Sequence, residues 1–484
     1  MEITELQELV AGTDKNKLVE AIKSTKDADF KTKYDLYVKQ WNTAQHEVVT
    51  NKILRPDKQG PDGKPIKVAR IPFPFQKLIV RRAAQFLCGN PIELEAKTDK
   101  DSLEEQFLQV IKKTWDDNKL DYDSKTLAKL MMAETEVAEL WFFEEAKEGY
   151  WKGTANDKAT VELRMRMKIL ANKYKDTLYP VFNSNGDMIA FARGYTTKTG
   201  TDKVEHLDIY TDVKRYLLTQ TNSGWDIVEE EEPSKKIPAV YYSQDDVEWV
   251  DVQWLIERIE VLLSKLADTN DYFAHPVLGV EADSVEQVEW PAKDDSGKAV
   301  LLKNGAKAGY IVWDVTPDSI KLELLQLRSL IMDMTDTPDI SFDQVKGLGS
   351  YSGIALKMIF SGAHMKASEK EEIFGKGIQR RINFLKTAHA YINGEFEAAV
   401  PLPIKPRFTY YVPKDAVEET NMLISAMGSG KALISQKTAI ELSSLVKDAD
   451  GELERIQEEE DAAATQQAAT NKTGSALDKL LNSN

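Results

Sequence analysis

Apolar residues in the first fifty positions recur three and four residues apart among charged neighbours, which is the spacing of a helix. We expect these helical segments to form an outer layer of the fold. The next segment, Arg55–Arg70, is rich in proline, glycine and lysine, which predicts an exposed, mobile loop. Helical spacing returns over 71–87, 103–118 and 123–138, so the first part of the chain is predicted to be mainly helical.

The pattern changes between Glu139 and Tyr242, where short apolar runs are separated by turn residues. Asn183–Asp187 joins two of these runs in the way that a hairpin turn does. This part is therefore predicted to contain an antiparallel sheet. The fold class predicted for the whole chain is α+β, predominantly helical.

Two helices are predicted in the middle of the chain. Ser243, with Asp246 three positions later, forms a capping-box-like start for the first helix, which we expect to reach about Asp271. Thr316 is a favourable N-cap for the second helix, and Pro317 suits its first helical position. Each helix carries an apolar stripe for packing, formed by Leu255, Ile259, Leu262 and Leu266 in the first and by Ile320, Leu324, Leu327, Ile331 and Met334 in the second.

The segment between these helices, Pro276–Val315, contains strand-like runs and is predicted to be a small β-rich module. Lys303–Asn304–Gly305 is the expected turn between two of its strands. An insert at the shared end of two helices requires them to run antiparallel, so copies around an axis would form a tube of paired helices. Val300, Ile311 and Trp313 would be poorly covered in a monomer, which favours packing between subunits.

The remainder of the chain is predicted to be a loop, a long helix and further helices. Thr337–Asp339 ends the second helix, and the glycine-containing segment to Ser352 is predicted to be a loop. A helix is predicted over Gly353–Tyr391, followed by an extended stretch at 402–412, helices from 414 to about 464 and a disordered tail. Candidate buried positions of the long helix are Ile354, Met358, Ile373, Ile378, Ile382 and Leu385. Its cations Lys376, Arg380, Arg381 and Lys386 could contact DNA, but ion pairs within the helix or between subunits are favoured, because Glu372 lies four residues before Lys376.

Composition sets the scale of the fold. With 484 residues, of which 42% are hydrophobic, the chain can bury a sizeable core, and its length predicts about three domains. The net charge of −16 argues against gripping nucleic acid through a broad basic face, because such binding needs cations that neutralise phosphates. It is compatible with a channel wall that repels a sliding polyanion, although excess acid also simply keeps a protein soluble.

Motifs that carry chemistry are scarce. Cys88 is the single cysteine, predicted to be a buried thiol, and five scattered histidines do not indicate a zinc cluster. Gly428–Lys431 resembles part of a phosphate loop, but Ser425 and Ala432 occupy positions where that motif needs glycine and a hydroxyl residue. No HExxH, GxSxG or CxxC motif occurs, so no catalytic residue, metal site or cofactor is predicted.

The sequence predicts a protein without a membrane anchor. No apolar stretch is long enough to span a bilayer, and Met1–Val10 lacks the basic and apolar regions of a signal peptide. We therefore expect synthesis in a reducing cytosol.

The order of the elements and four local phrases resemble the portal proteins of tailed bacteriophages, in particular the family of long-tailed phages. The phrases are jointly specific, and the resemblance spans about Phe73 to Asp461. They lie at Phe73–Ile92, Ile237–Val280, Thr337–Leu385 and Leu433–Glu460.

The resemblance implies a portal-type fold with named parts. These are a wing at 1–245, a stem helix at 246–275, a clip at 276–315, a second stem helix at 316–337, a tunnel loop at 338–352, a long wing helix with a return strand at 353–412, and a crown with a flexible tail at 413–484. The stem packing would use the two apolar stripes named above.

The resemblance also implies a function. The protein would be made in the host cytoplasm and would form a dodecameric ring at a capsid vertex of the virion. Double-stranded DNA would pass through this ring without sequence specificity. The ring would dock the terminase large subunit and head-completion (adaptor) proteins through residues of the clip, namely Val300, Lys303, Asn304, Ile311 and Trp313. It would also contact the major capsid and scaffolding proteins. In the tunnel loop, Lys346 would touch phosphates, Asp339 and Asp343 would limit adhesion, and Gln344, Gly347 and Gly349 would complete a pliant segment.

Two other classes stay open at this point. One is a packaging-associated nuclease or ATPase, which the incomplete phosphate loop disfavours, although scattered carboxylates leave a metal-dependent nuclease site open. The other is a capsid shell or scaffolding protein. A shell protein would assemble into closed lattices, whereas a portal would form annular particles.

Overall fold

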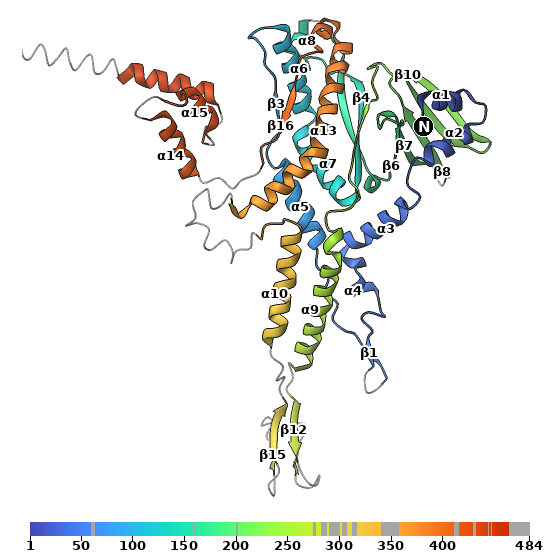
Figure 1. Cartoon of the computed structure of the whole chain (residues 1–484), viewed down its shortest axis with the longest axis vertical. Helices are drawn as coiled ribbons and strands as arrows, with labels where there is room; N and C mark the ends of the chain where they lie inside the picture. Colours follow the sequence, from blue (N-terminus) through green and yellow to red (C-terminus); the bar gives the residue numbers. More distant parts are fainter. Residues whose placement is uncertain are drawn as a thin grey trace, which may run out of the picture. The chain divides into compact units, whose positions relative to one another are not determined.

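The computed structural model describes residues 1–59, 63–158, 161–199, 202–273, 277–281, 288–289, 301–302, 307–311, 317–339, 358–410, 416–428, 432–443, 445–446 and 448–463 (Figure 1). The chain divides into two compact units. The first is Met1–Asp339 with Ser361–Tyr411, and the second is Ile340–Phe360 with Val412–Asn484.

A five-stranded antiparallel sheet with two helices on it forms one part of the first unit. Its order is β10-β9-β8-β7-β6. The strands lie at Gly224–Glu231, Lys214–Thr221, Asp202–Tyr210, Met188–Thr199 and Thr177–Phe182. The helices α1 (Ile3–Ala11) and α2 (Lys15–Lys23) bury Leu6, Leu18 and Ile22 in one cluster with apolar residues of the sheet. The outer helical layer and the hairpin at Asn183–Asp187 that were expected from the sequence are both confirmed.

A second, three-stranded sheet of order β11-β4-β5 anchors the largest core. Its strands lie at Ala239–Ser243, Glu136–Glu145 and Leu163–Leu170. The helices that share this core are α5 (Phe75–Cys88), α6 (Leu103–Asp117), α7 (Leu120–Glu134) and α13 (Ser361–Ile392). Ser102 caps α6 by accepting a hydrogen bond from the backbone N–H of Glu105, as its position before an apolar run indicates. The α+β fold class, with a predominance of helix, is confirmed.

Shorter elements complete the first unit. The helices are α3 (Phe30–Trp41), α4 (Glu47–Thr50) and α8 (Ala155–Lys158), with 3-10 turns at Thr43–Gln45, Asn172–Tyr174, Val250–Val252 and Gly394–Ala399. The strand β3 (Glu93–Glu95) pairs with β16 (Lys405–Arg407), and β1 (Lys58–Gln59) pairs with β2 (Pro65–Ile66). Within the predicted extended stretch 402–412, only β16 is a strand among the described residues.

The long helix α13 passes through the core. Ile378, Ile382 and Leu385 are buried as predicted, and Ile373 is half-buried. Met358 is 73% exposed, so its predicted burial was wrong, because it precedes the part of the helix that packs on the sheets. Ile354 lies outside the described residues.

A buried ion pair joins α13 to the second sheet. Arg381 and Glu139 are both fully buried, and the Nε of Arg381 lies 3.0 Å from each carboxylate oxygen of Glu139. Glu139 also accepts hydrogen bonds from the hydroxyl of Tyr242 at 2.5 Å and from the indole N–H of Trp141 at 3.0 Å. Burial lowers the pKa of Arg381, but the charge and hydrogen bonds of Glu139 outweigh it and hold that pKa above its ordinary value. Arg381 is thus a core residue that pairs with a distant strand of its own chain, whereas the sequence suggested an ion pair within the helix or between subunits.

The single thiol lies in the same core. Cys88 is buried at the last residue of α5, and burial raises its pKa to about 12. Such a thiol stays protonated and unreactive, as its place in an apolar helical stretch predicted.

The second unit is helical where the structure describes it. It contains α14 (Ala416–Met427), α15 (Gln436–Leu442) and a helix over 449–463. The side chain of Ser435 caps α15 by accepting from the backbone N–H of Thr438. The last helix is rich in acidic residues, which include Glu458, Glu459, Glu460 and Asp461, and most of its side chains are exposed.

Candidate functional site

Two paired helices form the candidate site. The helices α9 (Gln253–Phe273) and α10 (Pro317–Met334) pack against each other. The strand that follows α9 pairs antiparallel with the strand that precedes α10, so the two helices run in opposite directions (Figure 1). An exposed ion pair links them, because the guanidinium of Arg258 lies 2.7 Å from a carboxylate oxygen of Glu323.

The two predicted apolar stripes lie mostly in the shared core. Leu255, Ile259 and Leu262 of α9 and Leu327 and Ile331 of α10 are buried, and Leu266, Ile320 and Leu324 are half-buried. Met334 is 60% exposed, so its place in the stripe was wrong. Met334 is the last residue of α10, and the apolar packing does not extend as far as this end of the helix.

The insert between the helices pairs its strands in a nested order. The strand β12 (Val277–Glu281) pairs with β15 (Lys307–Ile311), and β13 (Val288–Glu289) pairs with β14 (Leu301–Leu302). The expected turn at Lys303–Asn304–Gly305 falls between β14 and β15 in the chain and lies outside the described residues. Ile311 is the last residue of β15, whereas Val300, Lys303, Asn304 and Trp313 lie outside the described residues.

The end of α10 is fixed by charged groups. A carboxylate oxygen of Asp339 lies 2.9 Å from the Nη2 of Arg328, and the guanidinium of Arg82 donates to the carbonyl of Pro338. Asp339 is therefore paired with a cation of its own chain, where the sequence suggested a free loop carboxylate. The other residues named for the tunnel loop, Asp343, Gln344, Lys346, Gly347 and Gly349, lie outside the described residues.

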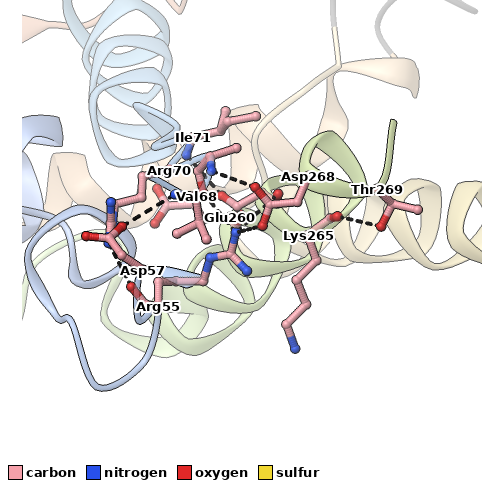
Figure 2. Close-up of polar contacts among 11 residues, drawn as sticks. Arg55, Asp57, Val68, Arg70, Ile71, Glu260, Lys265, Asp268 and Thr269 are labelled. Carbon is pink, nitrogen blue, oxygen red and sulfur yellow. Dashed lines mark hydrogen bonds and ion pairs between the residues drawn. The ribbon is translucent and has the colours of Figure 1, made fainter. Parts of the chain in front are cut away.

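The segment Arg55–Arg70, called the basic loop from here on, is bound at its base to α9. The sequence did not predict this contact, which is called the clamp below. Figure 2 shows the guanidinium of Arg55 directed at Asp268, with a shortest N–O distance of 2.5 Å. The same group donates to the backbone carbonyls of Ala69 at 2.9 Å and of Ser264 at 3.3 Å. The second carboxylate oxygen of Asp268 accepts the backbone N–H of Ala69 at 2.7 Å. Arg55 is only 7% exposed, so the predicted exposed loop is anchored at its start.

Two further polar residues of α9 continue this clamp. Glu260, which is 1% exposed, accepts from the backbone N–H of Phe73 at 2.7 Å and lies 2.6 Å from the Nδ1 of His46. The hydroxyl of Ser264 accepts the backbone N–H of Ile71 at 3.0 Å. Burial lowers the pKa of His46, but the hydrogen bond and charge of Glu260 raise it more, so the net pKa lies above the ordinary value. The signal in the sequence was the polar stripe Glu260, Ser264 and Asp268, spaced by four residues along an apolar helix.

Other features of the described residues do not indicate catalysis. An apolar groove of about 960 Å³ is lined by aromatic side chains that include Tyr34, Tyr37, Trp41, Phe73 and Phe75. Among the described residues, no group of three or more histidine, cysteine or acidic side chains is placed to hold a metal ion. No helix in the described part of the chain combines the length and apolar character needed to cross a membrane.

Comparisons with known proteins point to one family. A search of curated protein sequences gave no match. Among solved structures, the chain is similar to one described as "Neck of empty GTA particle computed with C6 symmetry". The TM-score is 0.37 and the identity is 11%, over 83% of this chain and 94% of that chain. This similarity is too weak to support a conclusion about function. The family described as phage portal protein, SPP1 Gp6-like, matches residues 17–466, which confirms the resemblance, and the chain belongs to that family.

Proposed function

We propose that this phage portal protein assembles into a closed dodecameric ring at one capsid vertex, with the paired helices α9 and α10 of each copy forming the channel wall. Membership of the portal family makes the chain a structural component of the phage particle. The observation that best supports the ring is the outer face of α10. There Leu322 and Leu325 are each 56% exposed, although they belong to a helix whose other face is packed.

The channel would conduct double-stranded DNA in both packaging and ejection without reading its sequence. The net charge of −16 supports a conduit, because a wall that mostly repels phosphates lets the polyanion slide. Segment 338–352 is the proposed tunnel loop, in which Lys346 would make transient phosphate contacts. Deleting residues 343–349 should leave rings intact and impair DNA retention or translocation. Loss of folding in that deletion would contradict a loop assignment.

The insert at 276–315 is the proposed docking site for the terminase large subunit and, later, for head-completion proteins. Its described residues form two short strand pairs, β12 with β15 and β13 with β14, between the two paired helices in the chain. The wing would contact the major capsid and scaffolding proteins. The virion vertex is the proposed site of action, with synthesis in the host cytoplasm. A non-enzymatic role is part of the proposal, and purified protein that hydrolyses ATP or cuts DNA by itself would contradict it.

Negative-stain microscopy combined with native mass spectrometry tests the ring directly. The purified chain should give annular particles with a central hole and one dominant mass near twelve copies. Closed lattices would indicate a shell protein. A stable monomer at the concentrations of assembly would overturn the proposal.

A further inference from the structure

The helix α9 is covered on two opposite sides. Its polar residues Glu260, Ser264 and Asp268 hold the segment from His46 to Phe73. Arg258 reaches α10 through its ion pair with Glu323. Two residues on a helix differ by about 200°, so Arg258 and Glu260 face nearly opposite directions. Figure 1 shows the result, with α10 on one side of α9 and the chain around α4 and β1 on the other.

The outer face of α10 is apolar and acidic. Leu322 and Leu325, three residues apart and therefore on one side of the helix, are each 56% exposed. Asp318 and Asp333 are exposed and lie on this face by helical spacing. Of the nearby cations, Arg328 turns away to Asp339, whereas Lys321 is exposed beside Asp318 and Leu325. Single exposed leucines need no explanation, but two large apolar side chains side by side on one helix face, flanked by carboxylates, form a surface suited to packing.

The segment 51–67, on the side of α9 opposite to α10, exposes apolar and positively charged side chains, which complement the apolar and acidic residues of α10. Ile53 is 95% exposed, and Leu54 and Ile66 are also exposed. Exposed lysines among its described residues, 51–59 and 63–67, include Lys52, Lys58 and Lys67. The ion pair between Arg55 and Asp268 fixes the base of the segment, so presenting these side chains to a partner costs little additional ordering.

We propose that the exposed residues 51–59 and 63–67 of one copy pack on the outer face of α10 in the next copy around the ring. Ile53 and its apolar neighbours would cover Leu322 and Leu325, and the lysines would face Asp318 and Asp333. The two surfaces differ and lie on opposite sides of one molecule, so the contact is head-to-tail and its repetition generates a ring when the rotation closes. This inference rests on the proposed ring and adds the pair of surfaces that builds it.

Cysteine cross-linking tests the contact in the full-length chain. The double variant Ile53→Cys with Leu325→Cys adds two exposed thiols, whereas Cys88 is buried and unreactive, so the background is clean. A short bis-maleimide added to assembled rings should give a ladder of covalent multimers on a denaturing gel. Each single variant should stay monomeric on that gel, because the contact joins two different surfaces.

A matched control pairs Ile53→Cys with Leu36→Cys, because Leu36 of α3 is 50% exposed but is not on α10. A ladder in the first pair and its absence in the control supports the contact. Rings without a ladder in the first pair, or equal ladders in both pairs, would overturn it and leave the ring proposal standing. A chain that stays monomeric, with native circular dichroism, would overturn the ring and this contact together.

Discussion

Gly377 of α13 lies directly against the ring of Tyr242 in β11. A Cβ atom at this glycine would lie only 2.0 Å from the Cε1 of Tyr242, far inside any allowed contact. The hydroxyl of the same tyrosine donates to Glu139, and its ring lies 5.0 Å from that of Phe374. Neither the ring nor the helix can move without disturbing the buried ion pair beside them. The glycine is therefore required by close packing, and no special backbone angle is involved.

Substituting Gly377→Ala should destabilise the fold. The added methyl forces the helix from the sheet, and overpacking of this kind costs about 1–3 kcal/mol. Gly375→Ala in the same helix is the matched control, since its Cβ would meet its nearest neighbour at 3.5 Å, an ordinary contact. The control should be stabilised by about 0.5–1 kcal/mol, because alanine is the better helix former. Urea denaturation followed by tryptophan fluorescence measures both, and equal stabilities in the two variants would contradict the packing argument.

Replacing Arg381 by methionine should lower the free energy of unfolding by about 3–5 kcal/mol, because it leaves the carboxylate of Glu139 buried without its cation. The double variant Arg381→Met with Glu139→Leu removes both charges and should recover much of that loss. Arg407→Met is the comparison, since its pair with Glu95 is more than half exposed and should change stability by less than about 1 kcal/mol. If the double variant is no more stable than Arg381→Met alone, the unpaired carboxylate of Glu139 is not the main cause of the destabilisation.

The sequence predicted those parts of the fold that depend on local pattern. Periodicity located α9, α10 and the hairpin at Asn183–Asp187, because each is formed by neighbouring residues. The predicted start of the first helix at Ser243 was wrong, since Ser243 ends β11 and α9 begins at Gln253. It did not pair Arg55 with Asp268, or Arg381 with Glu139, since these partners lie 213 and 242 residues apart. Exposure near helix ends was also misjudged, as Met334 and Met358 show, because a stripe does not reveal where its partner ends. The family was visible only through several phrases in order, since no single motif here requires one chemistry.

Glu134 gives the stability a pH dependence that can be measured. It is 8% exposed, and burial raises its pKa to about 7, although the backbone N–H of Lys173 donates to it. The folded pKa lies above the unfolded value of 4.5, so folding takes up a proton between these values and stability falls as pH rises toward 7. Glu134→Gln stays neutral and can still accept from Lys173. It should be more stable than the parent at pH 8 by on the order of 1–3 kcal/mol and nearly equal to it at pH 5.

Unfolding at both pH values, at matched protein concentration, tests the role of Glu134. Glu145→Gln removes an exposed carboxylate near the end of the adjoining strand β4 and controls for the change in net charge. A Glu134→Gln variant whose advantage is the same at pH 5 and pH 8 would mean that the carboxyl group does not titrate in this range.

The clamp at the base of the basic loop should protect that loop from proteolysis. Arg55→Met removes the guanidinium that joins Asp268 to two backbone carbonyls, and hydrogen bonds to charged groups contribute about 1.5–3 kcal/mol. That loss should raise the open population of the loop roughly tenfold or more, since about 1.4 kcal/mol corresponds to a factor of ten. Trypsin cleavage after Lys58 and Lys67, followed by mass spectrometry, should accelerate accordingly while the core melts at nearly the parent temperature. Arg407→Met, which breaks an exposed ion pair elsewhere, should leave these two cleavage rates unchanged. If Arg55→Met also leaves them unchanged, the loop is held by something other than its clamp on α9.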